Sequence, residues 1–319
     1  MTEKQPLLVV AGPTASGKTA LSVRLAKALD GEVVSADSMQ MYRKMDIGTA
    51  KPTEEEMGGI PHHLIGVLDP GETFSVADYA AMARPLIREI GARGKLPILT
   101  GGTGLYLDAI VQHIQFSPMP SDEVLRRELR ELARREGTEA LFAILRDCDP
   151  QTAAALHQNN LGRVIRAIEV YRLTGVPISE HNRRSRAVPP PYRVCYLGLT
   201  CRDRQNLYRR IDRRVDRMLE TGLVEEAREL FRGTVSLTAA QAIGYKELRS
   251  YLAGEESLAE AAERIKKESR NYAKRQLTWF RREKSIHWLE TDTFADEDAL
   301  CREALRIARA ELWEGGTEG

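Results

Sequence analysis

The octapeptide Gly12-Pro-Thr-Ala-Ser-Gly-Lys-Thr19 matches the pattern G-x-x-x-x-G-K-[ST]. An apolar run without alternation, Pro6–Ala11, comes directly before it and is typical of a buried parallel strand. An amphipathic helical pattern, Thr19–Leu29, follows it. A strand, a glycine-bearing turn and a helix in this order predict a phosphate-binding P-loop.

The P-loop is expected to bind a diphosphate or the phosphates of a nucleotide. Lys18 supplies a full positive charge, and the Thr19 hydroxyl is placed to bind Mg²⁺, the one cofactor expected. The alternative, a glycine-rich turn that arose by chance, is disfavoured by the flanking strand and helix. The predicted phosphate-binding residues are Gly12, Pro13, Thr14, Ala15, Ser16, Gly17, Lys18 and Thr19.

Strands and helices alternate beyond the P-loop. Glu32–Asp37 and Leu96–Thr100 are predicted strands, Ser75–Ala92 is a predicted helix, and another helix is expected to start near Thr103. This alternation predicts an α/β fold with a P-loop NTPase-like parallel sheet and right-handed connections.

The pattern changes in the middle of the chain, where proline-rich stretches at Ser117–Ser121 and Val188–Pro191 suggest two hinges. Only helical patterns lie between them, and an all-helical insertion is therefore expected. Three helices are predicted there: Ser121–Glu136, Glu139–Asp147 and Leu161–Thr174. The expected parts are residues 1–116, the first part of the core; 117–191, the insertion; and 192–319, the return to the core with basic C-terminal helices.

The last part is expected to open with a strand at Tyr192–Thr200, to be mainly helical, and to include one short strand at Ser285–Leu289. The four cysteines form no C-x-x-C pair, which argues against a disulfide framework and against a zinc site. The N-terminus has no apolar signal region and no long apolar run follows, so we expect a soluble cytoplasmic protein with no membrane association. No obligate protein partner is evident, and a monomer is expected.

Positive charge is concentrated locally, although the net charge of the whole chain is only +1. Residues 202–217 contain seven arginines against three aspartates, and residues 263–284 contain nine Lys or Arg against three Glu. Tyr272, Trp279 and Phe280 interleave with the second group. Such segments favour nucleic-acid phosphate contacts and base stacking. The alternative is a solvated helix whose Trp and Phe side chains face the core.

Asp37 is the carboxylate expected beside the phosphates. P-loop hydrolases usually carry an Asp at the end of another buried strand, but Leu96–Thr100 runs into Gly101-Gly-Thr103 without one. Asp37 ends the second predicted strand, and strand carboxyl ends line the ligand crevice of such sheets. A catalytic role competes here with a simpler one, because Asp37 could cap a turn or helix.

Seven segments together resemble the bacterial tRNA dimethylallyltransferases, in order, from residue 9 to about residue 290. They are Gly12–Thr19, Ser35–Tyr42 (SADSMQMY), Pro61–Leu64 (PHHL), Gly101–Tyr106 (GGTGLY), Arg163–Glu169 (RVIRAIE), Gln241–Lys246 (QAIGYK) and Lys274–Arg281 (KRQLTWFR). One departure is Asn160-Leu-Gly-Arg163, where the family often shows D-P-x-R.

The resemblance implies transfer of dimethylallyl from dimethylallyl diphosphate to N6 of the adenosine 3′ to the anticodon. The expected substrates are tRNAs that read codons beginning with U. The resemblance also implies Mg²⁺ and an insertion that grips the anticodon stem-loop. In this family the P-loop holds a diphosphate leaving group, which agrees with the absence of a strand-end Asp after Leu96–Thr100.

The resemblance also implies residue roles. Asp37 becomes the general base, Arg214 a donor to the leaving diphosphate, and Thr103 a contact to the extruded adenosine. On sequence alone, Arg214 could instead pair with Asp212 or Asp216, and Thr103 could cap the following helix. The expected tRNA-binding residues are Asp37, Ser38, Met39, Gln40, Thr103, Gly162, Arg163, Arg166 and Arg281.

Three other functions compete with this prediction: a small-molecule kinase, a prenyltransferase of free adenine nucleotides, and an RNA-binding NTPase switch. The basic segments disfavour the first two, and the missing strand-end carboxylate disfavours the third. His62 and His63 are adjacent, so their side chains diverge, and a loop near the active site or a plain turn is expected rather than a metal site.

Overall fold

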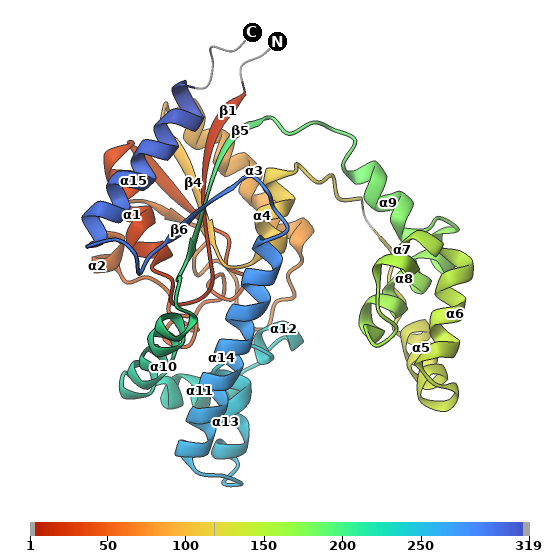
Figure 1. Cartoon of the computed structure of the whole chain (residues 1–319). Helices are drawn as coiled ribbons and strands as arrows, with labels where there is room; N and C mark the ends of the chain where they lie inside the picture. The colour runs from red at the N-terminus through yellow and green to blue at the C-terminus, as the bar shows by residue number, and fades with distance from the viewer. Residues whose placement is uncertain (1–3, 118, 315–319) are drawn as a thin grey trace. The chain divides into compact units, whose positions relative to one another are not determined.

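The computed structural model describes residues 4–117 and 119–314 (Figure 1). Pro118, inside the first expected hinge, and the first three residues of the N-terminus lie outside this range. The chain divides into two compact units, Met1–Val111 with Pro191–Gly319, and Gln112–Pro190. The second unit, the helical insertion, begins at Gln112 rather than at the expected residue 117.

The first unit is built on a parallel sheet of six strands in the order β3-β2-β4-β1-β5-β6. The P-loop strand β1 therefore lies inside the sheet, between β4 and β5. This arrangement confirms the predicted α/β class. The strands are β1 (Gln5–Ala11), β2 (Gly31–Ser35), β3 (His62–His63), β4 (Leu96–Gly101), β5 (Tyr192–Thr200) and β6 (Ile286–Glu290).

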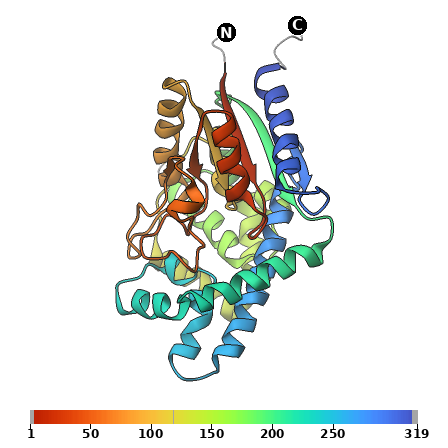
Figure 2. The same cartoon turned by 90° about the vertical axis from the view of Figure 1, so that its left-hand side faces the viewer.

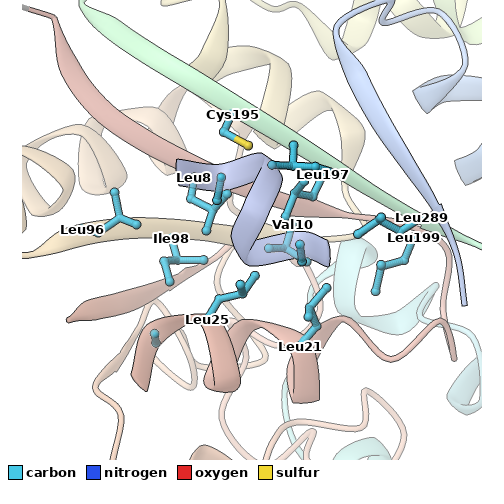
Figure 3. Close-up of a cluster of buried hydrophobic side chains, with 14 of the residues drawn as sticks. Leu8, Val10, Leu21, Leu25, Leu96, Ile98, Cys195, Leu197, Leu199 and Leu289 are labelled. Atoms are coloured by element: carbon cyan, nitrogen blue, oxygen red, sulfur yellow. The ribbon is translucent and has the colours of Figure 1, made fainter. Parts of the chain in front are cut away.

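Helices cover both faces of the sheet, which explains why its strands are apolar without alternation (Figures 1 and 2). One face packs on α1 and α15 through a leucine-rich cluster that includes Leu8, Val10, Leu25 and Leu197 (Figure 3). The other face carries α3 and α4. The helices around the sheet are α1 (Lys18–Ala28), α2 (Glu54–Met57), α3 (Val76–Ala92), α4 (Gly104–Val111), α15 (Glu297–Arg309) and the π-helical turn η1 (Ala310–Glu314).

Two predictions near the carboxyl edge of β2 were wrong in detail. The strand ends at Ser35, and Asp37 lies beyond it, because the Asp37 carboxylate accepts backbone hydrogen bonds that turn the chain out of the sheet. His62 and His63 form the short edge strand β3 rather than a turn, paired with Val33 and Val34.

A second set of helices extends from the carboxyl edge of the sheet (Figure 1). They make the predicted helical C-terminal region, and α14 packs against both α10 and α13. These helices are α10 (Arg204–Glu220), α11 (Leu223–Arg232), α12 (Leu237–Ala240), α13 (Tyr245–Leu252) and α14 (Leu258–Phe280).

The insertion unit has a hydrophobic core of its own, which includes Leu129, Leu141, Leu145 and Ile168. It is helical as predicted, and two short helices were not anticipated, α7 and α9. Its helices are α5 (Glu123–Glu136), α6 (Thr138–Cys148), α7 (Pro150–Ala155), α8 (Leu161–Thr174) and α9 (Ile178–Ser185).

Candidate active site

A cavity of about 1340 Å³ opens at the carboxyl edge of the sheet, within the first unit. This is the edge at which ligands of open parallel sheets bind. Its wall combines segments far apart in sequence: the P-loop, residues 37–40, residues 46–51, one side of α10, residues 237–246 and one side of α14.

The P-loop backbone is shaped to receive an anion. Ala15 and Gly17 have left-handed backbone angles, φ 61° and 90°, which help successive N–H groups to converge. Of the eight predicted residues, Thr14–Thr19 line the cavity, whereas Gly12 and Pro13 lie behind it. A Cβ atom at position 12 would come within 2.7 Å of the Leu199 carbonyl oxygen, so glycine permits the close approach of β5.

Ser16, within the P-loop, adds a hydroxyl donor to the backbone N–H groups. Its side chain is only 1% exposed, and its hydroxyl has no hydrogen-bond partner within the described part of the chain. A buried hydroxyl in this position calls for a ligand or a water molecule.

Lys18 projects into the cavity and donates to the Pro13 carbonyl oxygen at 2.7 Å. Burial lowers the pKa of Lys18 to about 8; the negative charge of Asp37 opposes this shift and the positive charge of Arg214 adds to it. Many protein atoms surround the Lys18 side chain, but it remains partly exposed and lines the cavity. The three charged groups therefore lie within electrostatic reach of one another, two positive and one negative.

Asp37 faces the same cavity, and its Oδ1 accepts N–H bonds from Met39 at 3.0 Å and Gln40 at 3.4 Å. The turn-capping role considered from the sequence is thus present. It uses one carboxylate oxygen and leaves Asp37 in the cavity wall, so the catalytic prediction and the capping role are compatible.

Arg214 does not pair with its neighbours on α10. Asp212 pairs with Arg270, and Asp216 lies 2.7 Å from Lys266. The alternative of a solvated ion pair with either aspartate is therefore wrong. Arg214 lines the cavity and donates to the Thr49 carbonyl oxygen at 3.3 Å.

Thr103 holds Ser38, a residue of the cavity wall, in place. Its hydroxyl accepts the Ser38 N–H at 3.0 Å, while its carbonyl, not its hydroxyl, accepts the Tyr106 N–H in the first turn of α4. The alternative role of Thr103, a side-chain cap of α4, is therefore replaced by a contact to Ser38. Among the described residues the cavity wall includes Ser38, Met39 and Gln40 but not Thr103.

Gln276 is the site residue whose role sequence reasoning missed. Its Oε1 accepts the Thr14 N–H of the P-loop at 2.9 Å, and its Nε2 donates to the Gly102 carbonyl oxygen at 2.9 Å. The side chain is almost completely buried. It lies on the same face of α14 as Tyr272, four residues earlier, and that spacing was the available signal.

The three aromatic residues Tyr272, Trp279 and Phe280 of α14 lie in different environments. Tyr272 lines the cavity, and burial together with the nearby Asp37 charge raises its pKa well above the usual value. Trp279 donates to Asp108 at 3.0 Å and carries the Arg282 guanidinium over its ring. Phe280 is 1% exposed and belongs to the core, so base stacking by Phe280 is excluded.

The predicted tRNA-binding residues outside the cavity differ in exposure and in the partners that they already have within the protein. Gly162 and Arg163 are exposed on α8, and Arg281 is exposed at the end of α14. Arg166 is instead held by Glu169 at 2.7 Å and by the Pro120 carbonyl oxygen at 2.9 Å. Any RNA contact by Arg166 must therefore use the part of the side chain that remains exposed.

Known proteins are similar to this chain over nearly its whole length. A family model described as IPP transferase matches residues 40–283, and one described as isopentenyl transferase matches residues 5–68. The tRNA dimethylallyltransferase of Halalkalibacterium halodurans is 51% identical, covering 93% of this chain and 95% of its own. That of Geobacillus thermodenitrificans is 52% identical, covering 91% of each.

The chain belongs to the tRNA dimethylallyltransferase family. Two solved members of the family share the fold. A full-length tRNA isopentenylpyrophosphate transferase from Bacillus halodurans superposes with a TM-score of 0.74 at 48% identity and covers 98% of both chains. A eukaryotic dimethylallyltransferase acting on tRNA gives 0.79 at 29% identity, covering 96% of this chain and 79% of that one. The family resemblance expected from the seven sequence segments is confirmed.

Two features are absent from the described residues. None of the helices there is both long and apolar enough to cross a membrane. Nor do three or more His, Cys, Asp or Glu side chains gather there into a metal-binding group.

Proposed function

We propose that this enzyme transfers a dimethylallyl group from dimethylallyl diphosphate to N6 of the adenosine 3′ to the anticodon. The substrates would be tRNAs that read codons beginning with U. The observation that carries the proposal is the shared cavity, in which the P-loop donors, Lys18 and Arg214 lie together with Asp37, the carboxylate whose charge acts on Lys18. Anion donors suit a diphosphate leaving group, and the carboxylate suits an acceptor that must lose a proton.

The reaction exchanges one bond for another. The adenosine N6 lone pair forms a bond to the allylic carbon, and the carbon–oxygen bond to diphosphate breaks with its electron pair on the diphosphate. N6 is a poor nucleophile because its lone pair is delocalised into the ring. Asp37 accepts the N6 proton as the new bond forms, so positive charge does not build up on the base.

The diphosphate is held by fixed donors during this step. The P-loop N–H groups, the Ser16 hydroxyl, Lys18 and Arg214 all surround the position that it would occupy. Such donors stabilise the charge that develops on the leaving oxygen. Because they are already in place in the protein, little reorganisation is needed.

Magnesium fits the same position. Thr19 is the second residue of α1 and lines the cavity. Its hydroxyl would bind Mg²⁺ as a P-loop ligand, and phosphate oxygens and water would complete the coordination. This agrees with the lack of a larger ligand cluster among the described residues. When bound, the ion would neutralise diphosphate charge.

The acceptor would enter beside residues 38–40, with Thr103 holding Ser38 in place. An adenosine must leave its stack to reach Asp37. Tyr272, on the cavity wall, offers an aromatic surface for the extruded base. The exposed Arg163 and Arg281, with Gly162 and the exposed part of Arg166, are proposed to contact the anticodon stem-loop. We expect the enzyme to act as a cytoplasmic monomer.

The direct test is to incubate the protein with radiolabelled dimethylallyl diphosphate, Mg²⁺ and unmodified tRNA, and then to analyse the nucleosides. We expect the label in N6-dimethylallyladenosine only. Label transferred to free AMP would support the alternative of a free-nucleotide prenyltransferase. Phosphate transfer from ATP, without prenyl transfer, would support a kinase and overturn the proposal.

A further inference from the structure

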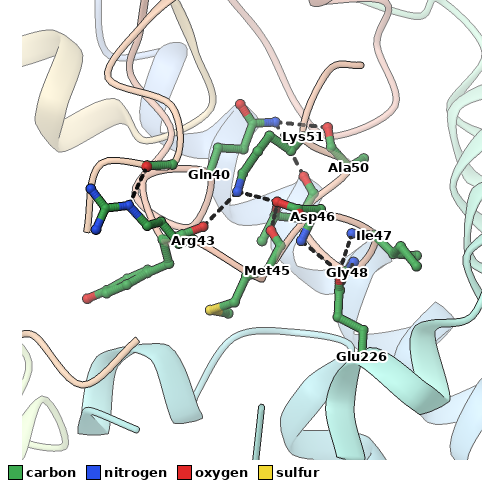
Figure 4. Close-up of polar contacts among 12 residues, drawn as sticks. Gln40, Arg43, Met45, Asp46, Ile47, Gly48, Ala50, Lys51 and Glu226 are labelled. Atoms are coloured by element: carbon green, nitrogen blue, oxygen red, sulfur yellow. Dashed lines mark hydrogen bonds and ion pairs between the residues drawn. The ribbon is translucent and has the colours of Figure 1, made fainter. Parts of the chain in front are cut away.

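A helix distant in sequence holds one wall of the cavity. Glu226, on α11, accepts three successive backbone N–H groups from the segment 46–51, which we call the 46–51 loop (Figure 4). Its Oε2 accepts from Asp46 and Ile47, both at 2.8 Å, and its Oε1 accepts from Gly48 at 2.9 Å. All six residues of the 46–51 loop line the cavity, whereas the described residues that form the cavity wall do not include Glu226.

Tyr245 of α13 completes this anchor. Its hydroxyl donates to Glu226 Oε1 at 2.5 Å, and its ring is fully buried. A Cβ atom at Gly48 would lie 2.5 Å from a ring carbon of Tyr245, so the loop packs directly on the ring. Burial, reinforced by the Glu226 charge, raises the pKa of Tyr245 well above its usual value, so the hydroxyl remains a donor.

The arrangement requires two acceptor oxygens on the side chain of residue 226. Each Glu226 oxygen accepts two hydrogen bonds. Three of the four partners are backbone N–H groups, which can only donate, and the Tyr245 hydroxyl could accept only by giving up its own donated bond. A glutamine would turn an NH₂ group toward two N–H groups, or toward one N–H group and the tyrosine hydroxyl. The isosteric amide therefore keeps two of the four hydrogen bonds and opposes the other two donors.

The anchor fixes the carbonyl group next to it in the chain. The Thr49 carbonyl oxygen, one residue after Gly48, accepts Arg214 Nη2 at 3.3 Å and Gln40 Nε2 at 3.3 Å. Gln40 also donates to the Ala50 carbonyl oxygen at 3.0 Å. The position of Arg214 in the cavity thus depends on a carbonyl whose own position depends on Glu226.

We propose that Glu226 is a positioning residue, which holds the 46–51 loop so that Arg214 is directed at the diphosphate. This inference rests on the proposed function, because it takes Arg214 as a diphosphate donor. It assigns Glu226 an effect on the prenyl-diphosphate half of the reaction and none on tRNA affinity.

The test compares Glu226→Gln with Glu229→Gln. Glu229 lies on the same helix, is 69% exposed and, among the described residues, forms an ion pair with Arg232 alone, so it is a matched control. We expect Glu226→Gln to raise both the Kd for inorganic diphosphate and the KM for dimethylallyl diphosphate by about tenfold or more. The KM for tRNA and the circular-dichroism spectrum should stay at wild-type values, and Glu229→Gln should match wild type throughout.

A double-mutant cycle separates positioning from general loss of structure. If Glu226 acts through Arg214, adding Glu226→Gln to Arg214→Lys should raise the diphosphate Kd by less than about twofold over Arg214→Lys alone. Multiplied effects of the two changes would overturn the inference. Tyr245→Phe removes one donor to Glu226 and leaves both carboxylate oxygens in place. It should raise the diphosphate Kd by less than Glu226→Gln does, and it provides a test even if Glu226→Gln fails to fold. A wild-type diphosphate Kd for Tyr245→Phe would overturn the inference.

Failure of this inference differs from failure of the proposed function. If wild-type protein transfers no label to tRNA, the proposed function fails whatever the variants do. If wild type transfers label normally and Glu226→Gln behaves like Glu229→Gln, only the positioning role of Glu226 is wrong.

Discussion

At the scale of single residues, burial beside the cavity disfavours the charged form of the Lys18 side chain. Its pKa of about 8, set mainly by burial, means that the ammonium is mostly charged below pH 8 and mostly neutral above it. Diphosphate needs the charged form. Affinity for inorganic diphosphate should therefore be steady below pH 8 and should fall by up to about tenfold per pH unit above it. Calorimetric titration across that range measures this.

Lys18→Arg provides the control, because a guanidinium stays charged throughout. The ligand titrates identically with both proteins, so a difference between the two profiles belongs to residue 18. We expect the decline above pH 8 to disappear in Lys18→Arg, even if its affinity is lower at every pH. The same decline in both proteins would show that another group titrates.

Asp37 performs two tasks that substitution can separate. Asparagine retains an oxygen that can accept the Met39 and Gln40 N–H groups, but it cannot take a proton from N6. Asp37→Asn should lower the rate of transfer by roughly 10²- to 10⁴-fold. Binding of diphosphate and tRNA should persist.

Single-turnover kinetics with saturating tRNA measures the chemical step directly. Asp37→Ala, which also removes the turn cap, should be no faster than Asp37→Asn and should in addition weaken tRNA binding. A wild-type rate for either variant would remove Asp37 from the mechanism.

At the scale of elements, α14 joins the P-loop to the loop that follows β4. Gln276 makes this link with one acceptor and one donor, both buried. In Gln276→Glu the donor to the Gly102 carbonyl is replaced by a second acceptor, leaving two oxygens opposed. We expect a loss of about 1–3 kcal/mol of stability and a weaker diphosphate affinity. Thermal unfolding and diphosphate titration measure the two effects.

Thr278→Val is the matched change on the same helix, because the exposed Thr278 hydroxyl donates to the Lys274 carbonyl oxygen within α14 and to no other group in the described part of the chain. It should leave both quantities near wild type. If Gln276→Glu bound diphosphate as tightly as Thr278→Val, the link would be structural only and would not shape the P-loop.

The elements that sequence predicted well are those with a strong local pattern. Tyr192–Thr200 and Leu161–Thr174 were predicted with the observed bounds, because buried runs and helical periodicity continue to their ends. The P-loop was recognised because its three parts are contiguous. The edge strand at His62 and His63 was missed, because two polar residues carry no strand pattern and the pairing partner lies at Val33.

The candidate site was predictable only in part for a related reason. Asp37 and Lys18 lie in local motifs, so their chemistry could be inferred from the sequence. Glu226 and Gln276 act on residues 178 and 262 positions away along the chain, and no local pattern specifies such partners. The pairing of Asp212 with Arg270, which leaves Arg214 directed at the cavity, is likewise a tertiary contact.

At the scale of the whole molecule, the chain folds as two units, each with its own core. Glu169 is one of two carboxylates buried in the described part of the insertion unit, and Asp149 is the other. Glu169 is fully buried and accepts from Arg126 at 2.9 Å, Arg166 at 2.7 Å and the Asp122 N–H at 2.7 Å. Burial alone would raise its pKa, but these bonds outweigh burial and hold the pKa below the usual value.

A carboxyl group whose pKa is lowered by folding stabilises the fold above its unfolded pKa, and this stabilisation is lost as the pH falls through the folded value. Acid should therefore destabilise the insertion unit through Glu169. Glu169→Gln should have a similar effect at neutral pH by leaving Arg126 and Arg166 without their buried partner. We expect a cost of about 3 kcal/mol, at the low end for broken buried pairs because both arginines are partly exposed.

The division into units decides how this loss should appear. In Glu169→Gln, hydrogen exchange should accelerate in residues 119–190 while the sheet of the first unit stays protected. Transfer to tRNA should fall, yet inorganic diphosphate should bind normally, since the cavity belongs wholly to the first unit. Glu131→Gln on α5, whose exposed pair with Arg134 is worth little, should change neither. Equal loss of protection in both units would mean that the chain unfolds as one cooperative body, and the insertion could then not be treated as a separable tRNA-binding unit.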